Sequence, residues 1–286
     1  MQKILLTGGH GMLGKTIEKV FSNNDFEVIV TDYHNADITD FNLFDSVLKK
    51  YEVDCVIHCA AMTAVDLCET EIDKAYLLNA VGSENVAKAC EVNNVRLVAI
   101  STDYIFDGES DRPYNEFDIG GNCHSVYGKS KYAGEVAVKT FCRNHVIARV
   151  SWLYGAGGPS FVHTMMKLAY NDNIEQLKVV DDQVGNPTST IAVANKLVEI
   201  VNKHNLTGVV HLTCEGEASW FDFVTEIYRI KGIDKKIIPC DSSEYPTPAQ
   251  RPKNSRLDKM VLRLHGMEPM PNWRDALSEF LDSEKF

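Results

Sequence analysis

The stretch Lys3-Ile-Leu-Leu-Thr-Gly-Gly-His-Gly-Met-Leu-Gly14 decides the fold of this chain. Its apolar first half predicts a buried strand, and the residues that follow have the spacing of an amphipathic helix. Glycines between a strand and a helix permit a tight turn and let the backbone approach a diphosphate. The free amides of the helix N-terminus then receive its charge. The stretch therefore predicts a dinucleotide-binding turn.

Short apolar runs and helical patterns alternate through the first half of the chain. The expected strands are Lys3–Thr7, Glu27–Thr31, Asp54–His58, Arg96–Ile100 and Val146–Val150. The expected helices are Leu13–Phe21, Phe41–Lys50, Ala75–Asn93 and Tyr127–Phe141. Near-continuous apolar strands separated by helices indicate a parallel sheet covered on both faces. The predicted fold class is α/β, a doubly wound parallel sheet of the Rossmann type, which binds ligands beyond the carboxyl ends of its strands.

The pattern is less regular beyond about residue 150. The expected elements there are the helices Phe161–Tyr170, Ile191–Lys203 and Trp220–Arg229 and the strand Val209–Thr213. The segment Ser242–Leu257 is rich in Pro, Ser and Arg and predicts an ordered irregular loop. Because no flexible linker separates the halves, we expect residues 1–150 to form a dinucleotide-binding domain. Residues 151–286 would form a smaller C-terminal substrate-binding lobe, interleaved with the first domain.

Composition excludes several classes of partner. The 286 residues carry a formal net charge of −11 and contain no basic tract, which argues against nucleic acid or an anionic membrane. No apolar run approaches the ~20 residues of a membrane-spanning helix, and the N-terminus lacks the layout of a signal peptide. The eight cysteines include no Cys-x-x-Cys pair, so we expect reduced thiols and a cytoplasmic protein.

A carboxylate follows the second predicted strand, at a position where it can discriminate between NADH and NADPH. Asp32 lies eighteen residues after Gly14. It can accept hydrogen bonds from the adenosine ribose and would repel a 2′-phosphate. No Lys or Arg lies between Val28 and Leu48 to favour that phosphate. We therefore expect NADH to be preferred over NADPH, although the glycine turn can bind the diphosphate of either cofactor.

A tyrosine and a lysine four residues apart, Tyr127 and Lys131, begin the helix that follows Ser101-Thr-Asp-Tyr104. Positions i and i+4 share a helix face, so the ammonium can lie near the phenol. Lowering a phenol pKa from about 10 to about 7 takes roughly 4 kcal/mol, which a cation in a partly dehydrated site can supply. The pair then becomes a proton donor at neutral pH. The alternative is a half-buried tyrosine beside a solvated lysine.

Motifs along nearly the whole chain resemble those of the extended short-chain dehydrogenase/reductase family. They are Thr7–Gly14, Ala60–Asp66, Ser101–Asp107, Tyr127–Lys131, Arg149–Tyr154, Asp182–Thr188 and Tyr245–Arg256. The resemblance implies reduction of the 4-keto group of a dTDP-4-dehydro-6-deoxy sugar by NADH or NADPH. It implies that Tyr127 donates the proton, that Lys131 holds the nicotinamide ribose, and that Thr102 hydrogen-bonds to the reacting carbonyl.

The same resemblance assigns the binding residues. The expected cofactor-binding residues are Gly8, Gly11, Met12, Leu13, Gly14, Asp32, Asp37, Ile38, Ala60, Ala61, Met62, Thr63, Ile100, Tyr127 and Lys131. The expected substrate-binding residues are Thr102, Asp103, Trp152, Arg251 and Arg256. Asp103 and Trp152 would contact the sugar, and the two arginines would hold its diphosphate. The alternatives are a Trp152 that belongs to the core and arginines that hold a loop by ion pairs.

Other members of the family remain as alternatives. A dehydratase would need Asp-Glu after Thr102, and Tyr104 stands in place of that Glu. Another nucleotide-sugar reductase or an epimerase stays open. So does a non-catalytic subunit like the relative that modulates a methionine adenosyltransferase, although the complete set of Thr102, Tyr127 and Lys131 favours an enzyme. Some members form metal-bridged dimers through an acidic residue where this chain has Lys15-Thr16. We therefore expect no metal and leave monomer and homodimer open.

Overall fold

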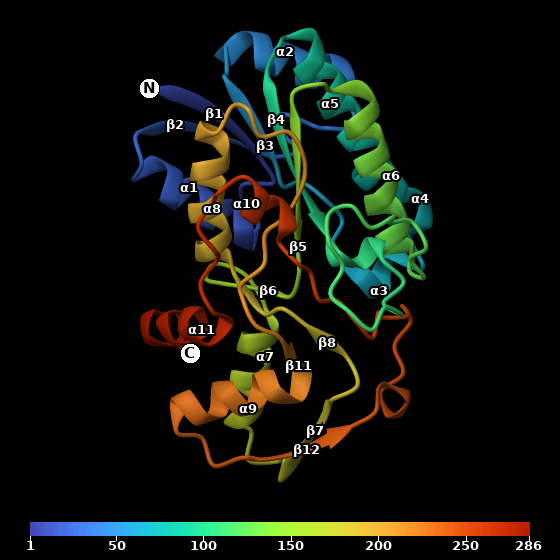
Figure 1. The fold of residues 1–286 in the computed structure, drawn as a ribbon, viewed down its shortest axis with the longest axis vertical. Helices are drawn as coiled ribbons and strands as arrows, with labels where there is room; N and C mark the ends of the chain where they lie inside the picture. The colour runs from blue at the N-terminus through green and yellow to red at the C-terminus, as the bar shows by residue number, and fades with distance from the viewer.

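Six parallel strands form the central sheet of this computed structural model, which describes residues 1–286 (Figure 1). Their order across the sheet is β10, β5, β4, β3, β1, β2. The strands are β1 (Gln2–Thr7), β2 (Phe26–Thr31), β3 (Cys55–His58), β4 (Arg96–Thr102), β5 (His145–Val150) and β10 (Gly208–His211). The strand order reverses between β1 and β3, which places a ligand cleft there, outside the carboxyl ends of the strands.

Alternating side chains of the strands build two cores, one on each face of the sheet. On β1, Ile4 and Leu6 lie in the core that includes α1 (Met12–Ser22) and α8 (Thr190–Asn202). Leu5 belongs to the other core, with α2 (Phe41–Tyr51), α5 (Gly82–Val92) and α6 (Val126–Phe141). Helices therefore cover both faces, and the predicted fold class is confirmed.

The predicted strands and helices are present within two residues of their expected ends, with one exception. The helix expected at Ala75–Asn93 is composite, since α4 (Ile72–Tyr76) is followed by a π-helical turn, Leu77–Val81, and then by α5. Such turns are rare and frequently occur near functional sites. This one carries Asn79, a buried residue that contacts the candidate site described below.

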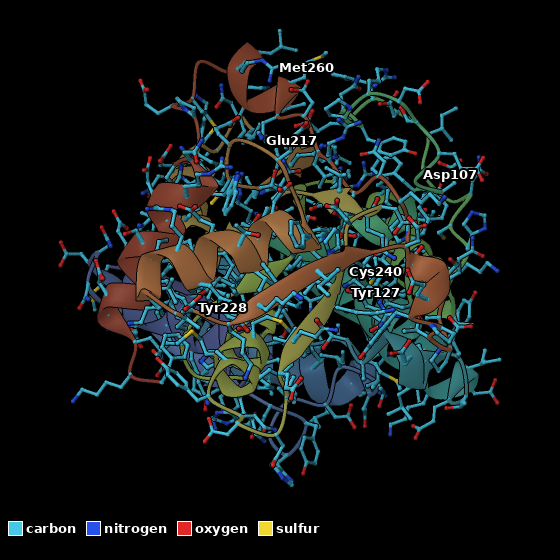
Figure 2. The ribbon with its side chains drawn as sticks, turned by 90° about the horizontal axis from the view of Figure 1, so that it is seen from below. Asp107, Tyr127, Glu217, Tyr228, Cys240 and Met260 are labelled. Atoms are coloured by element: carbon cyan, nitrogen blue, oxygen red, sulfur yellow. The ribbon has the colours of Figure 1, made fainter.

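The smaller lobe lies beyond the carboxyl ends of the sheet strands, at the lower end of Figure 1. It contains α7 (Phe161–Ala169), β7 (Gln176–Val180), α9 (Trp220–Lys231), β12 (Lys236–Cys240) and α11 (Trp273–Ser283). Its short strand pairs are β6 (Leu153–Tyr154) with β9 (Thr188–Ser189) and β8 (Val184–Gly185) with β11 (Ala218–Ser219). Figure 2 views the molecule from this side, with α9 in front of the sheet. From beyond residue 150, β10 joins the central sheet and α8 packs on one of its faces. The division into two interleaved domains at residue 150 stays a prediction.

The helices α3 (Val65–Cys68), α10 (Met260–Leu264) and α11 were not predicted from the sequence. Neither were the strands β7 and β12, nor the two-residue strands β6, β8, β9 and β11. The expected irregular loop, Ser242–Leu257, holds only one short 3₁₀ turn at Ser242–Glu244. None of the helices has both the length and the apolar character that crossing a membrane requires.

Candidate active site

A cleft of about 800 Å³ lies at the carboxyl ends of the sheet strands. It receives side chains from the β1–α1 turn, from the segments that follow β2 and β3, from the end of β4, and from α6. All of the predicted cofactor-binding residues except Met62 line it. Of the predicted substrate-binding residues, Thr102, Asp103 and Trp152 line it as well. The structure thus brings most of the predicted site residues together in one cleft, whereas Met62, Arg251 and Arg256 do not line it.

The glycine turn has no room for side chains. Gly8 has a φ of +65°, and a Cβ there would lie 2.7 Å from the amide nitrogen of Ala60. A Cβ on Gly14 would lie 2.6 Å from the Cα of Gly9 and nearer still to the carbonyl oxygen of Gly8. The N-cap of α1 is Gly11, and no side chain caps the amides that follow it. Free amides beside a glycine-walled surface suit a dinucleotide diphosphate, so the residues present fit such a cofactor.

Asp32 lies at the end of the cleft beyond β2. Its Oδ1 accepts a hydrogen bond of 2.8 Å from the His34 amide, and its Oδ2 lies 3.2 Å from His10 Nε2. The His34 amide is the main cause that lowers the pKa of Asp32, so the group is a carboxylate at neutral pH. Asp37 also lines the cleft, but its Oδ1 already accepts hydrogen bonds from the amide and hydroxyl of Thr39. The predicted contact of Asp37 with the cofactor stays a prediction.

Met62 faces away from the cleft. Its amide donates to Asn79 Oδ1 at 2.8 Å, and its carbonyl accepts from Asn79 Nδ2 at 3.1 Å. Its buried side chain packs with Cys68, Ala75 and Tyr127. Met62 therefore supports the site from behind, unlike Ala60, Ala61 and Thr63, because the chain turns inward to meet the π-helical segment.

The predicted catalytic residues meet at the floor of the cleft. Thr102 ends β4, and Tyr127 and Lys131 come from the first turns of α6. Lys131 Nζ donates to the Ile100 carbonyl at 2.8 Å. The ring of Tyr127 packs edge to face against Tyr104, with a centroid distance of 5.4 Å. All three predicted catalytic side chains are buried.

The protonation of this pair differs from the sequence prediction. Burial raises the pKa of Tyr127, although the nearby Thr102 hydroxyl opposes the shift. Burial also lowers the pKa of Lys131, to about 8, although the charge of Glu135 opposes that shift. The prediction that Lys131 brings the phenol pKa down is therefore not met in the free protein, because desolvation of the phenolate outweighs the stabilising contacts. Tyr127 carries its proton at neutral pH.

Residues that the sequence analysis missed hold the start of α6. Ser125 caps the helix by accepting a hydrogen bond from the Gly128 amide at 3.1 Å. Glu69 Oε1 accepts one from the Val126 amide at 2.8 Å. Ser130 donates to the Tyr127 carbonyl at 2.9 Å and accepts from Asn79 Nδ2 at 2.9 Å. A Ser before the helical pattern is a recognisable cap signal, whereas the Glu69 and Asn79 contacts join distant segments and leave no local signal.

Asp103 is a buried carboxyl group with one free oxygen. Its Oδ1 accepts a hydrogen bond of 3.0 Å from the Thr102 hydroxyl, whereas Oδ2 is buried and has no partner within hydrogen-bond distance. Burial raises the pKa of the group to about 6, although the hydroxyls of Ser255 and Ser151 lie near enough to oppose this shift. An unpaired acceptor in the wall of a cleft has a strong preference for a ligand that brings a donor, such as a sugar hydroxyl.

We expect Asp103→Asn to stabilise the protein at pH 7.5. The carboxyl group of Asp103 binds its proton more tightly in the folded state than in the unfolded chain. The contribution of Asp103 to the free energy of unfolding therefore decreases as the pH rises from about 4 through the folded pKa of about 6. The asparagine avoids this decrease, and its free energy of unfolding should exceed that of wild type by about 2–3 kcal/mol at pH 7.5. The difference should disappear near pH 4. Urea unfolding at both pH values measures it, and equal pH dependence of the two proteins would contradict it.

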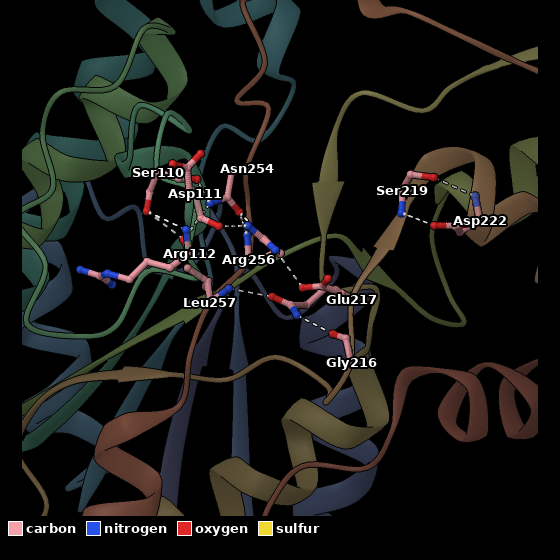
Figure 3. A network of polar contacts seen from close by, with 11 residues as sticks. Ser110, Asp111, Arg112, Gly216, Glu217, Ser219, Asp222, Asn254, Arg256 and Leu257 are labelled. Carbon is pink, nitrogen blue, oxygen red and sulfur yellow. Dashed lines mark hydrogen bonds and ion pairs between the residues drawn. The ribbon is translucent and has the colours of Figure 1, made fainter.

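The two predicted diphosphate-binding arginines line a second, larger cavity of about 1770 Å³. Arg251 forms a bidentate pair with Asp66, with Nη2–Oδ2 and Nη1–Oδ1 distances of 2.9 and 3.2 Å. Arg256 Nη1 lies 3.1 Å from Glu217 Oε2, and its Nε donates to Asn254 Oδ1 at 2.9 Å (Figure 3). Both arginines are thus engaged in ion pairs within the protein, and their diphosphate role stays a prediction.

Trp152 lies where the two cavities approach each other. Its ring stacks on Trp220 with a centroid distance of 3.5 Å and an interplanar angle of 4°. Trp152 lines the smaller cleft and Trp220 the larger cavity. The backbone of Trp152 has a φ of +46°, an uncommon conformation for a bulky residue and one that often marks a functional site.

Comparison with known proteins agrees with this geometry. A model of the family described as "RmlD substrate binding domain" matches residues 1–286. The spore coat polysaccharide biosynthesis protein SpsK of Bacillus subtilis is 36% identical over 281 residues, which are 98% of this chain and 97% of that protein.

Two solved structures are also similar over almost the whole chain. The dTDP-4-dehydrorhamnose reductase of Clostridium acetobutylicum has a TM-score of 0.94 and 43% identity and covers 98% of this chain and 99% of its own. The dTDP-4-dehydrorhamnose reductase of Bacillus anthracis, solved in complex with NADP, has a TM-score of 0.95 and 35% identity. The match covers 99% of this chain and 100% of that one. Matched from end to end in sequence and in fold, the chain belongs to the dTDP-4-dehydrorhamnose reductase family of the extended short-chain dehydrogenase/reductases.

Proposed function

We propose that this protein reduces the 4-keto group of dTDP-4-dehydrorhamnose to give dTDP-L-rhamnose, with NADH or NADPH as the reductant. The observation that carries the proposal is the meeting of Thr102, Tyr127 and Lys131 at the floor of a cleft whose other end is the glycine turn. The names of the similar proteins from Clostridium acetobutylicum and Bacillus anthracis support the choice of sugar.

The proposed chemistry divides the transfer between cofactor and protein. The bound nicotinamide supplies the hydride to C4. Tyr127, which keeps its proton at neutral pH because burial raises its pKa, gives that proton to the developing alkoxide oxygen. Lys131 uses one N–H on the Ile100 carbonyl and has two more for the nicotinamide ribose. Its charge also stabilises the phenolate that the transfer leaves. Thr102, whose hydroxyl donates to Asp103 Oδ1 in the free protein, exchanges that bond for one to the same substrate oxygen.

The remaining substrate contacts follow from the free and exchangeable groups of the site. The free Oδ2 of Asp103 accepts a sugar hydroxyl, and Trp152 packs against the sugar ring. Arg251 and Arg256 exchange Asp66 and Glu217 for the diphosphate oxygens, which suit an arginine fork equally well. All eight cysteines are free thiols, which supports the expectation of a reducing, cytoplasmic compartment.

The direct test follows the loss of reduced-nicotinamide absorbance with dTDP-4-keto-6-deoxy-L-mannose and a small panel of other nucleotide-linked 4-keto sugars. We expect turnover with the dTDP-linked sugar and, because Asp32 is an ionised carboxylate at the adenosine ribose end, a higher kcat/KM with NADH than with NADPH. Absence of oxidation of either cofactor with every sugar would refute the reductase. A higher kcat/KM with NADPH would refute only the cofactor preference.

A further inference from the structure

A buried carboxylate outside the cleft, that of Glu135, connects the elements that carry the catalytic residues. Glu135 lies on α6 one turn after Lys131 and two turns after Tyr127, and only 3% of its surface is exposed. Residues four apart share a helix face, so the three side chains lie along one side of α6. That side faces the end of β4, because Lys131 donates a hydrogen bond to the Ile100 carbonyl. Glu135 accepts one from Ser101, the next residue along the strand.

Both oxygens of Glu135 are hydrogen-bonded to the sheet. The Ser101 hydroxyl donates to Oε1 at 2.6 Å, while Arg149 donates from Nε to Oε1 at 2.9 Å and from Nη2 to Oε2 at 2.8 Å. Ser101 and Arg149 are register partners on β4 and β5, and Ser101 directly precedes Thr102. A bidentate arginine–carboxylate pair fixes orientation as well as charge, so these contacts set the position of α6 against β4.

We propose that Glu135 is a positioning residue for the reduction: through Ser101 and Arg149 it holds Tyr127 and Lys131 in register with Thr102, and it supplies the buried negative charge that Lys131 faces. The proposal rests on the proposed function, because that function gives the three catalytic residues their roles. It adds a residue that contacts neither the sugar nor the cofactor and acts through those that do.

The charge of Glu135 has a measurable consequence at Lys131. Burial lowers the pKa of Lys131 to about 8, and Glu135 opposes this decrease. The other titratable groups near Lys131 are Tyr127, which keeps its proton, and Cys59 and His58 at the end of β3. Burial raises the pKa of Cys59 to about 12 and lowers that of His58 to about 3, so both are neutral between pH 6 and 10. Removal of the carboxylate should therefore make Lys131 lose its proton at a lower pH.

The principal variant is Glu135→Gln combined with Arg149→Met. The double change removes both members of the ion pair, since removal of one alone leaves an uncompensated buried charge. We expect a folded protein with kcat about tenfold or more below wild type, because misplaced catalytic groups lose much of their effect. We also expect NADPH affinity to fall with rising pH through a midpoint below that of wild type. The shift should be smaller than loss of the carboxylate alone would give, because the positive charge of Arg149 is removed with it. Cofactor fluorescence measures this midpoint without any sugar.

Lys139→Met is the matched control. Lys139 lies one turn after Glu135 on the same helix, with its Nζ 3.5 Å from Glu135 Oε2, but its side chain is partly exposed and contacts no catalytic residue. Its loss should leave kcat within about twofold and the midpoint unchanged, because the contact is long, the ammonium is partly in solvent, and the bonds from Glu135 to Ser101 and Arg149 remain. If the double variant does not fold, Ser101→Ala tests the positioning alone. It keeps the charge, so kcat should fall about threefold or more with an unshifted midpoint.

The outcomes separate the two proposals. Wild-type kcat and an unshifted midpoint in the folded double variant, or wild-type kcat in Ser101→Ala, would overturn the role of Glu135. A shifted midpoint in a double variant, while neither it nor the wild type reduces any sugar, would uphold the action of Glu135 on Lys131 and refute the proposed reaction instead.

Discussion

Replacing Tyr127 by phenylalanine is expected to lower kcat for the reduction of dTDP-4-dehydrorhamnose by about 10²–10⁴-fold, the usual contribution of a positioned general acid. The fold should survive, because the Tyr127 ring stays packed against Tyr104 and within the cluster of Met62, Cys68 and Ala75. NADPH affinity should change by less than about tenfold, since the glycine turn and Lys131 are intact. Steady-state kinetics and a cofactor fluorescence titration measure the two effects.

Tyr132→Phe is the control for this change. Tyr132 lies on the same helix, five residues after Tyr127, but it does not line the cleft and its ring packs against Gly121. Its variant should keep wild-type kcat. Full turnover by Tyr127→Phe would remove the phenol from the mechanism. An equal decrease of kcat in both variants would mean that α6 tolerates no change. The low kcat of Tyr127→Phe would then not be evidence for proton transfer by the phenol.

The central sheet could be predicted because each of its strands is marked by a pattern of neighbouring residues. Each strand reads as an apolar run, and alternate residues such as Ile4 and Leu5 then fill opposite cores. The strands β7 and β12 have no such signal. β7 has only one buried residue, Val179, among exposed and partly buried ones. β12 contains Pro239, which a two-stranded ribbon tolerates because its open edge needs no amide donor. Their pairing joins segments separated by more than fifty residues, which no local pattern records.

The candidate site divides in the same way. Helical spacing predicted that Tyr127 and Lys131 lie together, because positions i and i+4 share a helix face. That Thr102 joins them was implied by the family resemblance and not by any short-range pattern, since it ends β4 while the other two lie on α6. The direction of the Tyr127 pKa could not be predicted, since it depends on how much water the folded chain removes from the phenol. Glu135 was missed for a related reason: its partners Ser101 and Arg149 are 34 and 14 residues away and meet it only through the β4–β5 register.

The second large effect is expected at the glycine turn, from Gly14→Ala. A Cβ at this position would lie 2.6 Å from the Cα of Gly9 and nearer still to the carbonyl oxygen of Gly8. Both are backbone atoms, so no side-chain rotation relieves the overlap and α1 must move away from the turn. We expect a loss of about 1–3 kcal/mol in the free energy of unfolding, typical of overpacking. NADPH affinity should fall on the order of 100-fold, because the turn and the helix amides no longer meet the diphosphate together.

Gly11→Ala separates overpacking from a general intolerance of the turn. Its Cβ would have a single near neighbour, the Gly8 carbonyl oxygen at 3.3 Å, which a small shift can accommodate. Thermal unfolding of Gly11→Ala should therefore stay close to wild type, whereas Gly14→Ala should melt several degrees lower. A Gly14→Ala protein that melts with the wild type and binds NADPH equally well would show that α1 can retreat at no cost. The close packing of Gly14 against Gly8 and Gly9 would then not be what shapes the cofactor end of the cleft.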